Sequence, residues 1–437
     1  MSFGPASAFF AIAPTPHGGR GVFATQHIPK DTLILTCESP YASVIHRKFR
    51  KEVCAWCFAW SLEVARKSSW SISVSLEPQQ VDEGRNAQKT NGPNAGVWFC
   101  GESCRNAWIS AGEGVPEGDD VNHAGVRGIL NATLERCLMT MEKDKAKSRT
   151  RSGVELGWAA FLLSLEDLDP TTKISLTFLD TTWEQAEKLS SISSSSTPIS
   201  KNIIIPNNKK SDSKVVPIFP TMLTEFELDT ARFVLAGLLK KCTDDFSQKE
   251  STGTRRINCT TYPSGDWADV LDLQDNALEH IQAKPYMLAS QIRIWVFIRF
   301  VVYSILRESK RLSDRTRHLV YSLKKSVDTP LETRALLGRE HGNVFGIWDM
   351  ALEEMNSEML GWGLYSFGSY FNHDCSPTLR KEHKGRAIEY YAIKDIDTGE
   401  ELCISYVETD QVVEKRKEAL KEWFFDCGCG TCVAELV

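Results

Sequence analysis

The grouping of its cysteines constrains the fold of this 437-residue chain more than any other feature of the sequence. More than half of the 13 cysteines fall into three short groups: Cys54 with Cys57, Cys100 with Cys104, and Cys427 with Cys429 and Cys432. Clustered thiols in an intracellular protein are typical of metal sites rather than of disulfides. Isolated cysteines such as Cys37 and Cys242 are instead typical of small core residues. The pattern therefore predicts a chain braced by metal at two places or more.

Length and composition exclude several other classes of protein. A chain of this length can hold two or three domains, and 42% hydrophobic with 25% charged residues excludes wholesale disorder. The formal net charge of −6 argues against a general nucleic-acid binder and favours encounters with basic protein segments.

Residues 1–16 lack the charged and apolar regions of a signal peptide. The most apolar stretch, residues 286–306, contains Arg293 and Arg299, which predicts a buried helix rather than a membrane span. We expect a soluble, monomeric protein of the nucleus or cytoplasm, or both, that binds neither membranes nor nucleic acid directly.

Turn and periodicity signals predict an α+β fold. Near the N-terminus, residues 17–21 read as a glycine turn, with short strands at 22–24 and 32–35. Helical patterns follow at about 120–185 and from about 221 to 326, with one helix beginning after Pro285. Short strands are expected from Asn343 onward, before a final helix near 409–423. Two polar stretches, 68–96 and about 189–220, are predicted to be a loop and a disordered insertion respectively.

The C-terminal part of the chain contains several short motifs in a fixed order. They are Gly361-Trp362-Gly363-Leu364-Tyr365, Asn372-His373-Asp374-Cys375, Gly399-Glu400-Glu401-Leu402-Cys403-Ile404-Ser405-Tyr406, and the final cysteine group. Taken alone, the second motif could be a polar turn and Tyr406 a strand aromatic. In this order and spacing, however, the motifs resemble the SET-domain protein-lysine methyltransferases, specifically the MYND-containing (SMYD-like) branch in its short, fungal-type form, which lacks a C-terminal helical-repeat domain.

This resemblance implies transfer of a methyl group from S-adenosylmethionine to a lysine side chain of a protein substrate, histone or non-histone. Such a reaction depends on bringing a sulfonium donor and an uncharged amine into line, so positioning carries much of the rate. The lysine amine is protonated at neutral pH, and a narrow, desolvated channel favours its neutral form. By resemblance, Tyr406 is the catalytic residue, whose hydroxyl orients the amine beside the donor methyl group.

The same resemblance implies a set of donor-contacting residues. They are Gly18, Gly19, Arg20 and Gly21 in the N-terminal turn, together with Asn276, Asn343, Asn372, His373, Tyr406 and Phe425. Glycines in the turn let backbone groups approach the donor closely. Phe425 matches the aromatic residue that covers the adenine. Tyr365 and Trp423 are expected to line the lysine channel.

Two structural zinc sites follow from the resemblance. The C-terminal site takes Cys427, Cys429 and Cys432, with Cys375 as the fourth ligand, because structural zinc prefers four tetrahedral ligands. The other site takes Cys54, Cys57, Cys100 and Cys104, which resemble two ligand pairs of a MYND finger. Its second zinc site is not recognisable, so we expect a reduced finger with one zinc.

The expected fold is a SET-type β-fold split by a zinc-finger insertion and a helical insertion, with a C-terminal cysteine-rich post-SET tail. The expected boundaries are residues 1–48 for the N-terminal part of the SET domain, 49–112 for the reduced finger, 113–340 for the helical insertion, 341–410 for the catalytic core and 411–437 for the tail. The alternative function is a catalytically weak SET/MYND module that binds other proteins. Methyl transfer to a non-lysine acceptor, such as a histidine or a protein N-terminus, also stays open.

Overall fold

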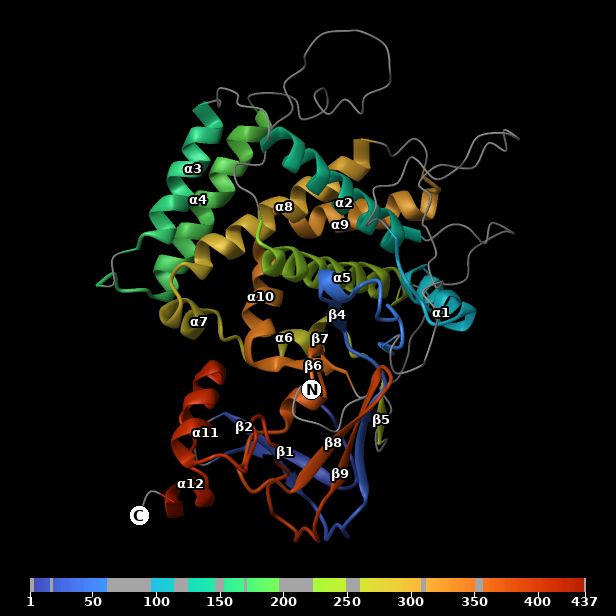
Figure 1. Ribbon diagram of the computed structural model, residues 1–437, viewed down its shortest axis with the longest axis vertical. Helices are drawn as coiled ribbons and strands as arrows, with labels where there is room; N and C mark the ends of the chain where they lie inside the picture. Colours follow the sequence, from blue (N-terminus) through green and yellow to red (C-terminus); the bar gives the residue numbers. More distant parts are fainter. Residues whose placement is uncertain are drawn as a thin grey trace.

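The computed structural model divides into a strand-rich part and a helical part, one above the other in Figure 1. It describes residues 4–15, 19–60, 96–113, 125–145, 153–168, 171–195, 223–248, 260–307, 312–349 and 357–435. The strand-rich part contains the described residues up to Ile45 and most of the described residues after Asn343, so segments from both ends of the sequence build one unit. The long helices between them form the other part.

Three small sheets make up the strand-rich part. A hairpin pairs β1 (Phe10–Pro14) with β2 (Arg20–Ala24). The second sheet has the order β5-β3-β9-β8, formed by β5 (Thr261–Tyr262), β3 (Leu33–Cys37), β9 (Ala387–Ala392) and β8 (Leu379–Lys384). The third has the order β4-β7-β6, formed by β4 (Ala42–Ile45), β7 (Met359–Leu364) and β6 (Val344–Trp348). Except for the parallel β3–β5 contact, all strand pairs are antiparallel.

Local sequence explains why these strands form where they do. Along β9, half-buried and buried residues alternate, as expected for a strand with one face on the core. Gly361 in β7 lies directly against the backbone of Val44 in β4, so any side chain there would overlap that neighbouring strand. Val44 pairs with Trp362 in the same register, which holds β7 at the centre of its sheet.

The helical part is built around one apolar helix. α8 (Met287–Arg307) is the one described helix long and apolar enough to cross a membrane by composition, but two-thirds of its most apolar stretch is buried inside the protein. Ile292, Trp295 and Ile298 are fully buried. Arg293 pairs with Glu166 and Glu227, which satisfies its charge within the fold. The prediction of a buried helix after Pro285 is confirmed.

The other helices surround α8. Within the helical part these are α2 (Gly125–Lys145), α3 (Gly153–Glu166), α4 (Leu176–Ser195), α5 (Glu225–Gln248), α6 (Trp267–Leu271), α7 (Ala277–Ala283), α9 (Asp314–Asp328) and α10 (Leu331–Asn343). α5 packs against both α8 and β4 and so joins the helical part to the sheets. The remaining helices are α1 (Glu102–Glu113) beside the first cysteine groups, and α11 (Val413–Leu420) and α12 (Gly430–Glu435) near the C-terminus. Short 3-10 turns occur at η1 (Arg47–Phe49), η4 (Gly368–Tyr370) and η5 (Lys421–Trp423).

The predicted α+β class is confirmed, and three local predictions need correction. The glycine turn connects β2 to β1, a strand that the sequence analysis missed, rather than to the strand at 33–37. The predicted disordered insertion begins too early, because residues 189–195 are the end of α4. The short strand β5 interrupts the helical stretch predicted for 221–326. The rest of the predicted insertion, 196–220, and almost all of the predicted 68–96 loop lie outside the described residues.

Candidate active site and cysteine clusters

The candidate site forms where the segment ending at Tyr406 runs alongside the Asn372–Asp374 motif. The backbone N–H of Ile404 donates to the carbonyl of Asn372 at 2.9 Å, and the N–H of Asp374 donates back to Ile404 at 3.0 Å. His373 and Ile404 pair in parallel. Two motifs that are about 30 residues apart in the sequence are therefore locked side by side.

His373 is held in one orientation by this crossing. Its Nδ1 accepts a hydrogen bond from the backbone N–H of Tyr406 at 3.1 Å. Its Nε2, which then carries the proton, lies 3.2 Å from the sulfur of Cys375. Burial lowers the pKa of His373 to about 4, so the ring is neutral at physiological pH. The histidine therefore links the Tyr406 backbone to a cysteine of the C-terminal cluster.

Tyr406 lies at the centre of an aromatic group. Its ring centroid is 5.5 Å from that of His373, 5.6 Å from Trp423 and 6.3 Å from Phe425. Its hydroxyl donates to the carbonyl of Phe371 at 2.8 Å. Burial raises the pKa of Tyr406, so the phenol stays protonated, and its oxygen keeps lone pairs for another donor.

The N-terminal glycine turn reaches the same place. The side-chain amide of Asn372 donates to the carbonyl of Arg20 at 3.0 Å and to Glu401 at 2.9 Å. A side chain at Gly21 would overlap the carboxylate of Glu401 and would displace it from Asn372. Gly19 has φ +73° and open space where a side chain would stand. Gly18 lies outside the described residues.

The Arg20 side chain points to another segment of the site. Its guanidinium donates to the carboxylate of Asp272 at 2.7 Å and to the Asp272 carbonyl at 2.6 Å. The Tyr370 hydroxyl donates to the same carboxylate. These bonds attach the turn to the loop between α6 and α7, where Asn276 lies. What Arg20 offers a ligand is therefore mainly its backbone.

Asn276 and Asn343 flank a kink at the end of α10. Gly342 has φ +89°, and the Asn276 amide donates to the carbonyl of His341 at 2.6 Å. The amide of Asn343 is bonded to the carbonyls of Gln274 and Arg339, both at 3.0 Å, so it holds the kink in place. The Asn276 Oδ1 is buried and has no partner. An unpartnered buried acceptor is costly, and it marks a place where a ligand donor would fit.

Tyr365 is placed differently from the other predicted site residues. Its hydroxyl donates to the carbonyl of Arg386 at 2.8 Å, and its ring packs edge-on against Phe345. It is 1% exposed, and these contacts place it in the main core. Trp423, the other expected channel residue, contacts Tyr406 directly.

Sequence reasoning missed two residues that organise the site. Glu401 accepts from Asn372, and Asp272 joins Arg20 to Tyr370. Glu401 stands inside the Gly399–Tyr406 motif, so the signal for it was present. Asp272 begins the segment Asp272-Leu273-Gln274-Asp275-Asn276, whose resemblance pointed to Asn276, but its own role depends on two distant partners and could not be assigned from the sequence.

The C-terminal cysteines converge as the resemblance implied. The sulfurs of Cys375, Cys427, Cys429 and Cys432 all lie within 4.8 Å of one another, and Cys375 and Cys432 are 3.5 Å apart. A tetrahedron with Zn–S bonds of about 2.3 Å has S–S edges of about 3.8 Å, so four thiolates at these spacings fit a zinc ion. The cluster packs with Leu420 and the half-buried Tyr406 and Trp423.

The second cluster lies beside α1. The sulfurs of Cys54, Cys57, Cys100 and Cys104 also lie within 4.8 Å of one another. The Cys57–Cys100 distance is 3.5 Å and the Cys100–Cys104 distance is 3.3 Å, which again fits tetrahedral zinc. Arg386, from the turn between β8 and β9, donates to the carbonyl of Trp56 at 2.7 Å and lies 4.0 Å above its ring.

Comparisons with known proteins agree with this geometry. The SET domain family matches residues 19–407. The potential protein lysine methyltransferase SET6 of Saccharomyces cerevisiae is 27% identical over 438 residues, which span 98% of this chain and 96% of the yeast protein. A SET and MYND domain-containing protein of Dictyostelium discoideum is 33% identical over 102 residues, 23% of this chain and 25% of that protein. N-lysine methyltransferase SMYD2-A of Danio rerio is 33% identical over 85 residues, 19% of this chain and 20% of that protein. Because the family match spans most of its length, this chain belongs to the SET-domain family.

Proposed function

We propose that this protein is an S-adenosylmethionine-dependent methyltransferase that methylates lysine side chains of protein substrates. The observation that carries the proposal is the position of Tyr406. Its hydroxyl is anchored on the Phe371 carbonyl, and its ring lies against Trp423 and His373. The same crossing holds Asn372 on the glycine turn. Membership in the SET-domain family supports the same activity.

The residues around the crossing fit the methyl donor. The open space at Gly19 and the unpartnered Oδ1 of Asn276 would receive its polar groups. Phe425, which lies 6.1 Å from the His373 ring and is partly exposed, would cover its adenine. The bound donor supplies an electrophilic methyl group on a positively charged sulfur.

The chain's own residues would prepare the substrate amine. The Tyr406 hydroxyl donates its proton to the Phe371 carbonyl, so the phenol oxygen can accept an N–H from the incoming lysine. This hydrogen bond would point the lone pair of the lysine nitrogen toward the methyl group of the donor. Trp423 excludes water on one side of that amine. Desolvation lowers the pKa of a lysine ammonium, so loss of its proton to solvent before transfer becomes easier.

We also propose that each cysteine cluster holds one structural zinc, two per chain. The closed set of four thiols in each cluster leaves no place for a catalytic water among the described residues. Elemental analysis of the purified protein should find about two zinc ions per chain. A count near zero would remove both assignments.

The activity is tested by incubating the protein with donor labelled in its methyl group and with protein extracts. We expect label to enter protein, and mass spectrometry to place it on lysine side chains. Label on histidine or on protein N-termini would move the proposal to another acceptor. Tight donor binding without any label in protein would favour a SET/MYND module that acts through protein binding.

A further inference from the structure

A separate cavity lies where the finger meets the helical insertion. Its volume is about 270 Å³. Its wall is formed by Trp98 and Trp108 from the finger region, by residues of α2 and α5, and by β4. Among the described residues, none of those assigned to the Tyr406 site or to the two cysteine clusters lines it. This cavity therefore has no role in the proposed reaction or in zinc binding.

The lining of the cavity is basic and aromatic. Its basic residues are Arg50, Arg127, Arg232, Lys240 and Arg386, and its aromatic residues are Tyr41, Trp56, Phe58, Trp98 and Trp108. Within the described part of the chain, no aspartate or glutamate lines it. In a protein with a net charge of −6, such a lining is a local reversal of sign. A cavity lined by one sign of charge attracts ligands of the opposite sign.

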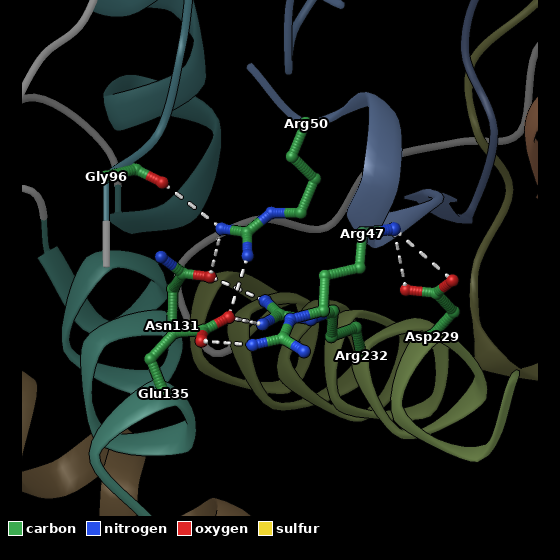
Figure 2. Close-up of polar contacts among 7 residues, drawn as sticks. All are labelled: Arg47, Arg50, Gly96, Asn131, Glu135, Asp229 and Arg232. Atoms are coloured by element: carbon green, nitrogen blue, oxygen red, sulfur yellow. Dashed lines mark hydrogen bonds and ion pairs between the residues drawn. The ribbon is translucent and has the colours of Figure 1, made fainter. Parts of the chain in front are cut away.

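Figure 2 shows the polar contacts of Arg50 and Arg232, two of the arginines that line this cavity, and of the neighbouring Arg47. Arg50, Arg232 and Arg47 all pair with the single carboxylate of Glu135, which is 3% exposed. Asn131 Oδ1 accepts from Arg50 at 2.7 Å and from Arg232 at 2.6 Å, but an amide brings no charge. One carboxylate thus serves three guanidinium groups.

Asp229, the other acidic residue in Figure 2, forms no direct ion pair with Arg50 or Arg232 within the described part of the chain, although its charge acts on both at longer range. It accepts from the backbone N–H of Arg47 at 3.1 Å and lies 3.1 Å from His46 Nδ1. Desolvation and the like charge of Arg232 lower the pKa of Arg50 to about 9. Desolvation also lowers the pKa of Arg232 and of Arg386. Burial therefore makes the positive charges of these three arginines costly.

Unused hydrogen-bond donors accompany the excess charge. The Nε of Arg232 and the Nε of Arg386 are both buried and have no partner. Within the described part of the chain, the Arg386 guanidinium donates to the backbone carbonyl of Trp56 and forms no ion pair with a carboxylate. A buried guanidinium without an anion is costly, and a ligand carboxylate would satisfy both its charge and its donors.

We propose that this cavity binds a short acidic segment of a partner protein, with a carboxylate at the arginines and an aromatic or apolar side chain against the tryptophans. A nucleotide fits the geometry less well. Arginines already lie over Trp56, Trp98 and Trp108, at 4.0, 5.8 and 5.9 Å from the ring centroids. These contacts occupy one face of each ring, so a base that needs a whole ring face stacks less well there than a side chain that packs against a ring edge.

The test uses the full chain and a fluorescein-labelled peptide of alternating aspartate and phenylalanine. Its control is the same peptide with asparagine in place of aspartate. Fluorescence anisotropy should show that the acidic peptide binds at least about 10-fold more tightly, because each charge-assisted hydrogen bond contributes that order of affinity. The difference should shrink as salt is raised. Equal binding of the two peptides, or no binding of either, would overturn the proposal.

Two variants locate the binding site. Arg232→Met removes a buried donor, but it also breaks the pair with Glu135, so its fold is checked by circular dichroism. Lys240→Glu is milder, since Lys240 pairs with its helical neighbour Asp244 at 2.6 Å and otherwise lies 5.5 Å from the centroid of the Tyr41 ring. The Lys240→Glu variant should lower the affinity for the acidic peptide by about 10-fold or more.

The control variant is Arg380→Gln, because Arg380 is exposed on β8 and pairs with Asp31 and Glu382. Unchanged binding by Lys240→Glu, or an equal loss in Arg380→Gln, would contradict this location. If ATP displaces the peptide and binds more tightly than the peptide does, the assignment of a peptide ligand to this cavity is also overturned. None of these outcomes depends on the proposed methyl transfer.

Discussion

Each of the two clusters offers four cysteine sulfurs as ligands, but the two clusters have very different neighbours. The C-terminal cluster is built from residues next to the active-site motifs, since Cys375 follows His373 and Cys427 follows Phe425 within two positions. It packs directly against Tyr406 and Trp423. The N-terminal cluster packs instead against α1 and the Arg386 turn, next to the basic cavity. The comparison teaches that two similar sets of four cysteines can lie in quite different surroundings, one beside the Tyr406 site and the other beside the basic cavity.

Loss of a C-terminal ligand should have the largest effect. Cys432 is fully buried and lies 3.5 Å from the sulfur of Cys375, so Cys432→Ala leaves three thiols and loosens the tail that carries Phe425. We expect loss of one zinc and a fall in methyl transfer of about 100-fold or more, with weaker donor binding. Zinc analysis, donor titration and a methylation assay measure the three effects.

Cys403→Ala is the matched control for this variant, because Cys403 is also buried but belongs to neither cluster. It should keep both zinc ions and most of the activity. A Cys432→Ala protein with full activity would show that the tail does not shape the active site.

Tyr406→Phe should separate chemistry from metal bracing. It removes the hydroxyl bonded to Phe371 but keeps the ring between Trp423 and His373. We expect turnover to fall on the order of 100-fold while zinc content and donor affinity stay near their original values. Single-turnover methylation and donor titration make this distinction.

Tyr390→Phe is the control for the tyrosine variant. Tyr390 is fully buried near Phe371, and its hydroxyl has no hydrogen-bond partner. Removing that hydroxyl should leave activity unchanged and should not lower stability. If both variants lose activity equally, the assigned role of Tyr406 is wrong.

Loss of a finger ligand should affect methyl transfer much less. Cys104→Ala should release one zinc, yet change methylation of a short peptide by no more than about 5-fold, because the cluster has no described contact with Tyr406. Binding of the acidic peptide should fall further, since the finger forms one wall of the cavity. Ser103→Ala, at the exposed neighbouring position, is the control. An activity loss equal to that of Cys432→Ala would end the contrast between the clusters.

Arg386→Met should have the smallest effect. It removes the hydrogen bond to Trp56 and the charge above its ring while keeping much of the apolar side chain. We expect the lost hydrogen bond and ring contact to be partly offset by removal of a buried charge, leaving a loss of about 1 kcal/mol in the free energy of unfolding. Denaturant unfolding of the variant and of the original protein measures this difference in the free energy of unfolding. An unchanged stability would show that the finger is held by its other contacts, such as Arg50 with Gly96.

Much of the fold and site could be predicted because short motifs report local chemistry. The spacing of Cys427, Cys429 and Cys432 indicated a metal site, and the order of the later motifs indicated the family. The helix after Pro285 was also predictable. Its arginines indicated that it does not span a membrane, and the periodic spacing of its apolar residues indicated a helix buried in the core. Each of these conclusions depends on residues that are close together in the sequence.

Contacts between distant segments could not be predicted in the same way. The pairing of Arg20 with Asp272 joins residues about 250 positions apart, and three arginines meet on Glu135 only when η1, α2 and α5 pack together. Their meeting depends on the free energy of the whole core, and no local pattern carries that information. The amino-acid order thus determined the family and the two groups of cysteines that could bind metal. The packing of helices against sheets decided where each cysteine cluster lies. It also created the basic cavity, which lies where the finger meets the helical part.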